Sequence, residues 1–246
     1  MPLKKLLLKA GVNRENTRYT SEGGWYECDK IRFRQGTPEK IGGWQRISAA
    51  NFQGICRSLW NWVTLGSQNL IGVGTNLKFY LENGGQYNDI TPLRATLTLT
   101  NPFETVSGSP IVTVTDAAGG YKDGDFVTFS GATAVGGLTL NGEYEITFTE
   151  AVNEYAIDAG ANASSSATGG GTVTAAYQIN VGTGFAIPIT GWGASAWGFG
   201  TWGVGETSVE SIRLWTQSNF GEDLIFGPRG GAIYYWEANS GISSRG

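Results

Sequence analysis

The sequence contains no histidine, a single methionine at position 1 and only two cysteines, Cys28 and Cys56. Without histidine, the chain cannot form a His-based catalytic triad, use a histidine general base or bind a metal through imidazole. Two cysteines alone form neither a disulfide framework nor a structural zinc site. They are typical of a protein made in a reducing compartment.

Charged residues and long apolar runs are also scarce. Charged residues make up 15% of the chain, against about 25% in an average globular protein. Near the N-terminus the apolar run is only Leu6–Leu8, whereas a signal peptide needs about 7–15 apolar residues and a membrane span about 18. We therefore expect a soluble protein with no targeting segment and no membrane insertion.

Glycine and aromatic residues are abundant instead. Glycine accounts for 38 of 246 residues, and aromatic residues for 12%, including nine tryptophans. A disordered chain would have high charge and few aromatics, so this composition indicates a folded protein with many turns. The length allows one large all-β domain or two smaller ones.

The charge is distributed unevenly along the chain. Residues 1–60 carry eleven basic and five acidic side chains, whereas the remainder carries six basic and sixteen acidic ones. This asymmetry indicates opposed electrostatic faces. The basic region either contacts nucleic acid or an acidic protein surface, or is a solvated face with no ligand.

One basic segment has the alternation of a half-buried strand. Lys30, Arg32 and Arg34 alternate with Ile31 and Phe33. A strand at this position would place the three cations in a row on its solvent side. We predict a turn over residues 35–38, and we assign Lys30, Arg32 and Arg34 to a candidate assembly interface.

Two stretches, 57–83 and 213–239, repeat one pattern. Each predicts a strand, a polar turn, an apolar strand, a glycine turn and an aromatic strand that ends in an acid. Strands at this spacing suit a sandwich, barrel or propeller, and self-similar units favour propeller blades. The alternative is two unrelated meanders. The repeat predicts blade-core anchors at Trp60, Tyr80, Trp215 and Trp236.

Residues 100–178 differ in composition from both flanks. Lys122 is their only basic residue, against nine acidic ones. The alternation predicts strands near 111–115, 126–130, 137–141, 154–158 and 172–178. The Ser/Ala/Gly-rich run 161–171 is predicted to be a flexible loop. We expect a small β-barrel or sandwich domain inserted into the chain.

These patterns together predict an all-β protein with partial or oligomer-completed β-propeller-like blades and an inserted small β-barrel/sandwich domain. Residues 1–99 form the N-terminal arm and the first blade or blades. Residues 100–178 form the inserted domain. Residues 179–246 form a Trp/Gly-rich loop and a further blade.

The Trp/Gly-rich loop contains Trp192, Trp197 and Trp202, which are five residues apart and are each followed by glycine. No regular helix or strand has a period of five, which predicts a looped segment anchored by its tryptophans. Tryptophans can stack on sugars or unpaired bases. They also pack into cores and subunit interfaces, and we assign these three to the candidate assembly interface.

Candidate catalytic and metal-binding groups are few. Glu27 and Asp29 are two residues apart, but their spacing predicts no cleft between them that could hold a sugar. Cys28 has no neighbouring base that would activate its thiol as a nucleophile. Residues 123–125 (Asp-Gly-Asp) lack the later ligands of a calcium loop, and residues 169–172 lack the lysine of a phosphate-binding loop. We predict no enzyme activity, no catalytic residue, no metal and no cofactor.

Several segments resemble the large virion structural proteins of short-tailed bacteriophages and prophages. The most specific block comprises Gly11-Val12-Asn13, residues 25–36 (WYECDKIRFRQG) and residues 38–44 (PEKIGGW). Further similar segments are residues 89–94 (DITPLR), 124–132 (GDFVTFSGA), 136–138 (GGL) and 220–225 (FGEDLI). The resemblance covers most of the chain.

The resemblance implies the tail tubular, or nozzle, class, in which propeller-containing subunits form a ring around the DNA exit channel below the portal and adaptor. It implies a homo-oligomer, usually a hexameric ring, that contacts the portal, the adaptor and other tail proteins. Double-stranded DNA would pass through transiently. The protein would belong to the virion tail and would be assembled in the bacterial host cytoplasm.

The chain departs from this class in length, because such relatives are usually several times longer. A fragment, a truncated member, or half of a propeller completed by another chain would each account for the difference. A DNA conduit must let the duplex slide, so we expect the cations of residues 1–60 to dock on a neighbouring subunit or the adaptor rather than grip DNA.

Two other functions compete with a structural tail component. The first is a glycan-binding host-receptor module, as in a tail fibre or spike, that uses the Trp-rich loop. The second is a polysaccharide-degrading enzyme, which the sequence disfavours because it shows no pair of catalytic carboxylates.

Overall fold

The computed structural model describes residues 8–15, 17–20, 23–43, 45–46, 48–117, 120–151, 153–183 and 212–245. The predictions for Trp192, Trp197 and Trp202 therefore lie outside the described residues. The described residues contain 17 strands, all paired antiparallel, and one short 3₁₀ helix, Ala238–Ser240. This confirms the all-β class. No helix among them is long and apolar enough to cross a membrane.

The chain divides into two compact units, Met1–Ile47 and Ser48–Gly246. The first unit contains one hairpin, β1 (Ile31–Arg34) and β2 (Thr37–Lys40). Gln35 and Gly36 connect the strands with φ angles of 50° and 83°, the left-handed geometry of a tight hairpin turn.

The hairpin corrects two sequence predictions. The turn occupies two residues rather than the predicted 35–38, because Thr37 and Pro38 already belong to β2. Lys30 has a φ of 56° and precedes β1, so the exposed cations within the strand are Arg32 and Arg34.

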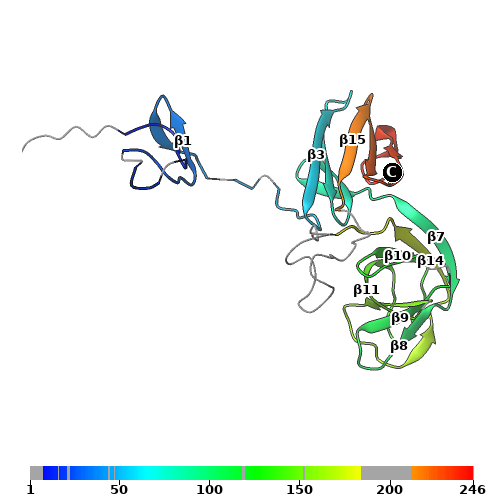
Figure 1. The fold of residues 1–246 in the computed structure, drawn as a ribbon. Helices are drawn as coiled ribbons and strands as arrows, with labels where there is room; N and C mark the ends of the chain where they lie inside the picture. The colour runs from blue at the N-terminus through cyan, green and yellow to red at the C-terminus, as the bar shows by residue number, and fades with distance from the viewer. Residues whose placement is uncertain are drawn as a thin grey trace, which may run out of the picture. The chain divides into compact units, whose positions relative to one another are not determined.

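The second unit begins and ends with two antiparallel meanders. The first comprises β3 (Cys56–Val63), β4 (Asn69–Thr75), β5 (Phe79–Asn83) and β6 (Gln86–Asp89). The second comprises β15 (Trp215–Phe220), β16 (Asp223–Pro228) and β17 (Tyr234–Trp236). The predicted repeat of strand, turn, strand, turn and strand is confirmed, and Figure 1 shows β3 beside β15.

One shared aromatic core joins the two meanders. The centre of the Phe79 ring lies 4.9 Å from the centre of the Trp215 ring and 4.3 Å from that of the Phe226 ring. Gly74 permits this close approach, because a Cβ there would lie 2.6 Å from Cγ of Trp215. The indole Nε1 of Trp215 donates a 2.7 Å hydrogen bond to the Thr75 carbonyl. The Trp215 side chain is therefore held both by aromatic packing and by a hydrogen bond.

The structure places Tyr80, Trp215 and Trp236 in buried positions, at 6%, 7% and 1% exposure, but Trp60 is 40% exposed. The expectation for Trp60 was wrong because the two strand registers differ. Trp60 pairs with Gly72 in its sheet, whereas Trp215 pairs with Pro228 near the far end of β16. Trp62 provides the buried tryptophan of β3 instead.

The repeat-related residues Leu70 and Leu224 both point into this core. Corresponding faces of the two meanders therefore pack against each other, as in a two-layer sandwich, which we call the sandwich. Blades repeated radially around an axis would present non-corresponding faces to each other. The described strands establish several antiparallel sheets, and they do not establish a propeller.

The inserted part is one antiparallel sheet with the strand order β13-β8-β9-β12-β11-β10-β14-β7. Its strands are β7 (Leu93–Thr100), β8 (Phe103–Thr105), β9 (Ile111–Thr115), β10 (Phe126–Ser130), β11 (Gly142–Ala151), β12 (Glu154–Asp158), β13 (Ala167–Gly169) and β14 (Thr172–Gln178). We call this part the insert. The predicted boundary between residues 99 and 100 falls inside β7.

The insert curls around its own core. Phe103, Phe129 and Tyr177 are among the side chains at 1% exposure or less. Only two residues separate β13 from β14, which lie near opposite ends of the strand order, so the sheet must bend back on itself. No ladder closes it into a barrel among the described strands.

Local strand predictions in the insert were mostly accurate. Strands at 111–115, 126–130, 154–158 and 172–178 have the predicted bounds. Residues 137–141 do not form the predicted strand; Leu138 makes only an isolated bridge with Val135. The predicted flexible loop 161–171 is instead ordered around β13, because Ala163 is 2% exposed and its backbone bonds to Gly108 and Ser109.

The difference between the two matched tryptophans is testable. Trp215→Ala removes a buried ring and its hydrogen bond to Thr75, and we expect it to lower the free energy of unfolding by roughly 3–5 kcal/mol. Trp60→Ala serves as the matched control and should have a clearly smaller effect, because its ring is already partly in water. Urea denaturation followed by circular dichroism measures both; equal losses would contradict the register assignment.

Candidate functional site

The residue that is most unusual for its position is Lys78, whose side chain is only 3% exposed. A local turn fixes it at the start of β5. The Thr75 hydroxyl accepts a 2.8 Å hydrogen bond from the Lys78 amide and donates a 2.9 Å bond to the Lys78 carbonyl. A buried ammonium group is costly unless opposite charges and hydrogen bonds surround it.

Two carboxylates provide this compensation from different parts of the chain. Asp89, the last residue of β6, lies 3.1 Å from the ammonium nitrogen of Lys78. Glu143 of β11 forms the second ion pair, and it comes from the insert. Phe126, also in the insert, makes a cation–π contact: the centre of its ring lies 4.3 Å from the ammonium nitrogen of Lys78.

Gln178 and Arg245 complete the cluster. The Gln178 amide donates hydrogen bonds of 3.2 Å to Asp89 and 2.6 Å to Glu143. The Arg245 guanidinium lies 3.5 Å from Asp89 and 3.7 Å from Glu143, and it donates a 2.8 Å bond to the Thr91 carbonyl. We call Lys78, Asp89, Glu143, Gln178 and Arg245 the root cluster, because it joins the sandwich, the insert and the C-terminal segment.

The electrostatics of the root cluster are balanced, with two cations facing two carboxylates. Burial alone would raise the pKa of Asp89, but Lys78, Arg245 and the hydrogen bonds from Thr91 outweigh it and hold that pKa below 3.8. Burial, together with the charges of Asp89 and Glu143, raises the pKa of the nearby Tyr80 hydroxyl to about 12. Asp89 is thus ionised and Tyr80 neutral at physiological pH.

A second polar contact lies on the other connection between the insert and the sandwich. Asp125, at 1% exposure, accepts hydrogen bonds from the Lys122 amide, the Val181 amide and the Asn180 side chain, all between 2.7 and 2.8 Å. Burial raises the pKa of Asp125 despite these donors. Asp125 therefore ties the segment after β14 to the turn before β10.

The contacts of the root cluster hold three segments of the second unit together. Both carboxylates already accept from Lys78 and Gln178, and the ammonium group of Lys78 is enclosed. Among the described residues, no group of three or more Cys, Asp or Glu side chains is placed to hold a metal ion.

The structure does not gather the sequence-predicted interface residues into the root cluster. Arg32 pairs with Glu39 across the hairpin at 3.1 Å, and Lys30 lies 4.0 Å from Asp29. Arg34 is exposed. These residues form a surface of the first unit, and whether it is an interface stays a prediction.

Sequence reasoning missed the root cluster. The segment 89–94 was noted only for its resemblance, although Asp89-Ile90-Thr91 was a usable signal. The Asp89 carboxylate accepts a 2.9 Å bond from the Thr91 amide, a local turn that an Asp-x-Thr pattern favours. No comparable pattern marks Lys78, Glu143 or Arg245.

Comparison with known proteins yields no matching family model and no match among curated proteins. Among solved structures, the chain is similar to the phage phi92 endosialidase, with 19% sequence identity over 58% of this chain and 21% of that chain. This chain thus spans about a fifth of the length of that protein. The TM-score of 0.31 is too low to carry an argument about fold or function.

Removing one carboxylate tests the root cluster. Glu143→Gln leaves the buried ammonium group of Lys78 with a single anionic partner and should lower the free energy of unfolding by roughly 1.5–3 kcal/mol. Glu145→Gln, two residues away on the exposed face of β11, should have little effect. Adding Lys78→Met to Glu143→Gln should recover stability, because no unpaired buried charge remains. Chemical denaturation measures all four chains, and equal effects of the two Glu→Gln changes would contradict the account.

The lowered pKa of Asp89 predicts a pH dependence. Its stabilising contribution is fully present above the unfolded-state pKa, near 3.8, and is lost as the pH falls through the lower folded-state pKa. The free energy of unfolding should therefore fall more steeply with acidification below about pH 4.5 in the wild-type chain than in Asp89→Asn. Glu104→Gln, at an exposed position, is the control and should keep the wild-type slope. Parallel slopes for wild type and Asp89→Asn would contradict the ion-pair assignment.

Proposed function

We propose that this protein is a non-enzymatic structural component of a short bacteriophage tail, a nozzle-like ring subunit that lines the DNA ejection channel below the portal and adaptor. The resemblance of its N-terminal block and its later segments to virion proteins of this class motivates the proposal. The fold is compatible with it, since the described residues are all-β and are arranged as consecutive antiparallel sheets.

The observation that carries the proposal is the presence of exposed large apolar side chains on the outer sides of both sheets of the sandwich. On β3, Leu59 and Val63 point away from the shared core and are 66% and 59% exposed. On the second sheet, Phe220 and Tyr235 point away from it and are 69% and 48% exposed. Exposed large apolar side chains on the outer sides of a sheet are candidates for contact with another protein.

These two outer faces belong to different sheets, so they differ in sequence and in shape. A contact between the first outer face of one copy and the second outer face of the next would be heterologous, and such contacts close into rings when the rotation permits. In this proposal the two meanders act as blade-like units whose outer faces are covered in the oligomer. A hexameric ring is the expected form, and double-stranded DNA passes through it only transiently.

The glycan-binding alternative depends on Trp192, Trp197 and Trp202. These residues lie outside the described part of the chain, and no described feature favours a sugar ligand.

Measuring particle mass and shape tests the proposal directly. We expect the purified chain to form closed rings in mass photometry and negative-stain images. Phe220→Asp should shift the population toward monomers without changing the circular dichroism spectrum, because it charges an outer face that contributes nothing to the core. Asn162→Asp, an exposed change in the insert, is the matched control and should assemble normally.

The opposite results are equally clear. A wild-type chain that stays monomeric at micromolar concentration, in low and in physiological salt, would contradict a self-assembling ring subunit. Assembly that Phe220→Asp leaves unchanged would show that the outer face of the second sheet is not part of the contact.

A further inference from the structure

The outer face of the insert is acidic. On β8 and β12, Phe103, Tyr155 and Ile157 point into the core at 1% exposure or less, so their neighbours along each strand point outward. These outward neighbours include Glu104, Glu154 and Asp158, and Glu145 points outward from β11. We call Glu104, Glu145, Glu154 and Asp158 the acidic face.

The strand register brings three of these carboxylates, Glu104, Glu154 and Asp158, to one surface. Glu104 pairs with Thr113 of β9, and Thr113 pairs on its other side with Ala156 of β12. Glu154 and Asp158 lie two residues to either side of Ala156 and thus on the same face. Three carboxylates therefore surround Thr113 on neighbouring strands.

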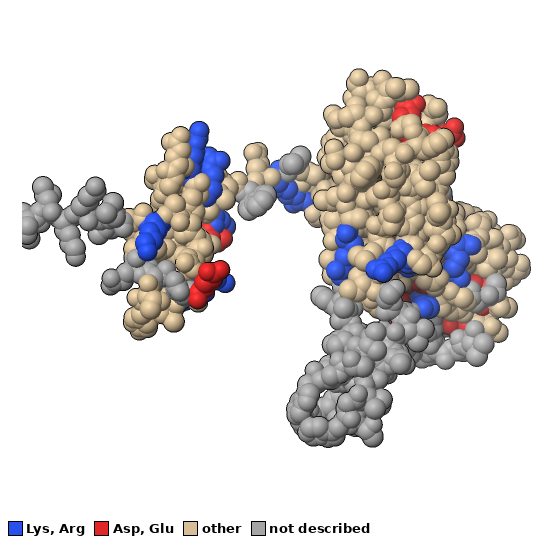
Figure 2. All heavy atoms as spheres, turned by 45° about the horizontal axis from the view of Figure 1, so that its top comes forward, with Lys and Arg blue, Asp and Glu red and all other residues tan. Residues whose placement is uncertain are grey.

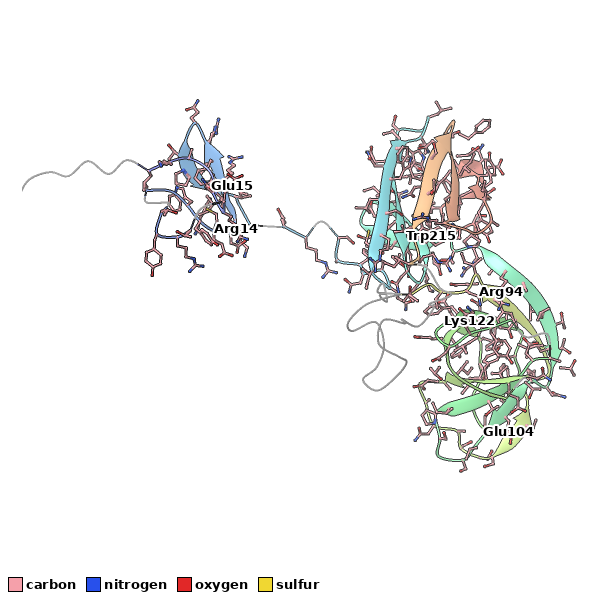
Figure 3. The ribbon with its side chains drawn as sticks, in the orientation of Figure 1. Arg14, Glu15, Arg94, Glu104, Lys122 and Trp215 are labelled. Atoms are coloured by element: carbon pink, nitrogen blue, oxygen red, sulfur yellow. The ribbon has the colours of Figure 1, made fainter. Side chains whose placement is uncertain are left out.

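The insert contains little positive charge that could offset the acidic face. Lys122 is the only basic residue between residues 100 and 178. Figure 3 shows Lys122 and Arg94 close to the connection with the sandwich, while Glu104 lies at the opposite end of the insert. Within the described residues, none of the four carboxylates makes an ion pair.

The first unit has the complementary surface. Arg32 and Arg34 project from one face of β1, and the exposed Lys and Arg side chains of this unit are blue in Figure 2. Arg32 shares its charge with Glu39, whereas Arg34 makes no ion pair with a described residue. None of the described residues in this unit is fully buried, so its hairpin has surface available for a partner.

We propose that the Arg32/Arg34 face of the hairpin docks on the acidic face of the insert of a second copy. The proposal rests on the self-assembly proposed above and assigns it a polar contact in addition to the apolar outer faces. Arginines two residues apart on a strand are about 7 Å apart, so each guanidinium can pair with a separate carboxylate. Each copy carries both surfaces, which allows the contact to repeat around a ring.

Charge reversal in the full-length chain tests this contact. Arg34→Glu and Glu104→Arg should each raise the concentration required for half-maximal assembly at least tenfold at low ionic strength. The double variant Arg34→Glu/Glu104→Arg should recover assembly, because the pair is restored with its signs exchanged. Lys40→Glu, on the other face of the hairpin, and Asp123→Lys, near Lys122, are matched charge controls and should assemble like the wild type.

Cross-linking identifies which copies are in contact. A carboxylate–amine cross-linker applied to a mixture of ¹⁵N-labelled and unlabelled chains should join Lys30 of one isotope to Glu104 or Asp158 of the other. Cross-links of this kind support docking between copies. If these residues are joined only within a single chain, the proposed partner is wrong.

The outcomes separate this proposal from the one on which it rests. If the wild-type chain forms no oligomer, the ring function itself fails. If the wild-type chain assembles and both single charge reversals assemble equally well, only the docking proposal is overturned. If Arg34→Glu abolishes binding to duplex DNA without changing assembly, the hairpin contacts nucleic acid instead.

Discussion

The burial of the Lys78 ammonium group is the constraint on which the second unit depends. This charge is tolerated because two carboxylates pair with it, Asp89 from the sandwich and Glu143 from the insert. Gln178 and Arg245 then orient both carboxylates. The insert is thus attached through charges that would be unpaired if it moved away, a stronger constraint than its short covalent connections alone.

The core between the two meanders is apolar, in contrast to the charged root cluster. The core between the meanders depends on aromatic rings and on Gly74, which lets the Trp215 ring approach the backbone of β4. This packing uses one face of each sheet, and on the other faces large apolar side chains such as Leu59 and Phe220 stay exposed. The proposed assembly role rests on these exposed apolar side chains rather than on a reactive group. The acidic outer face of the insert adds a polar surface that is separate from them.

The sequence predicted a large part of the fold and little of the site. Strands such as 111–115 and 154–158 were predicted with their observed bounds, because side-chain alternation and turn residues are local signals. The root cluster was not predicted. Lys78 and Glu143 are 65 positions apart, and no spacing rule connects them.

The sequence by itself determined the all-β class, the two meanders and the separation of basic and acidic regions, since alternation, glycine turns and composition act over a few residues. Only the tertiary structure decided that corresponding faces of the meanders meet, that Trp62 rather than Trp60 is buried in β3, and that residues 161–171 are ordered around β13. These features depend on strand register and on contacts between distant segments. A shift of two residues in pairing preserves the alternation pattern while changing which side chains are covered.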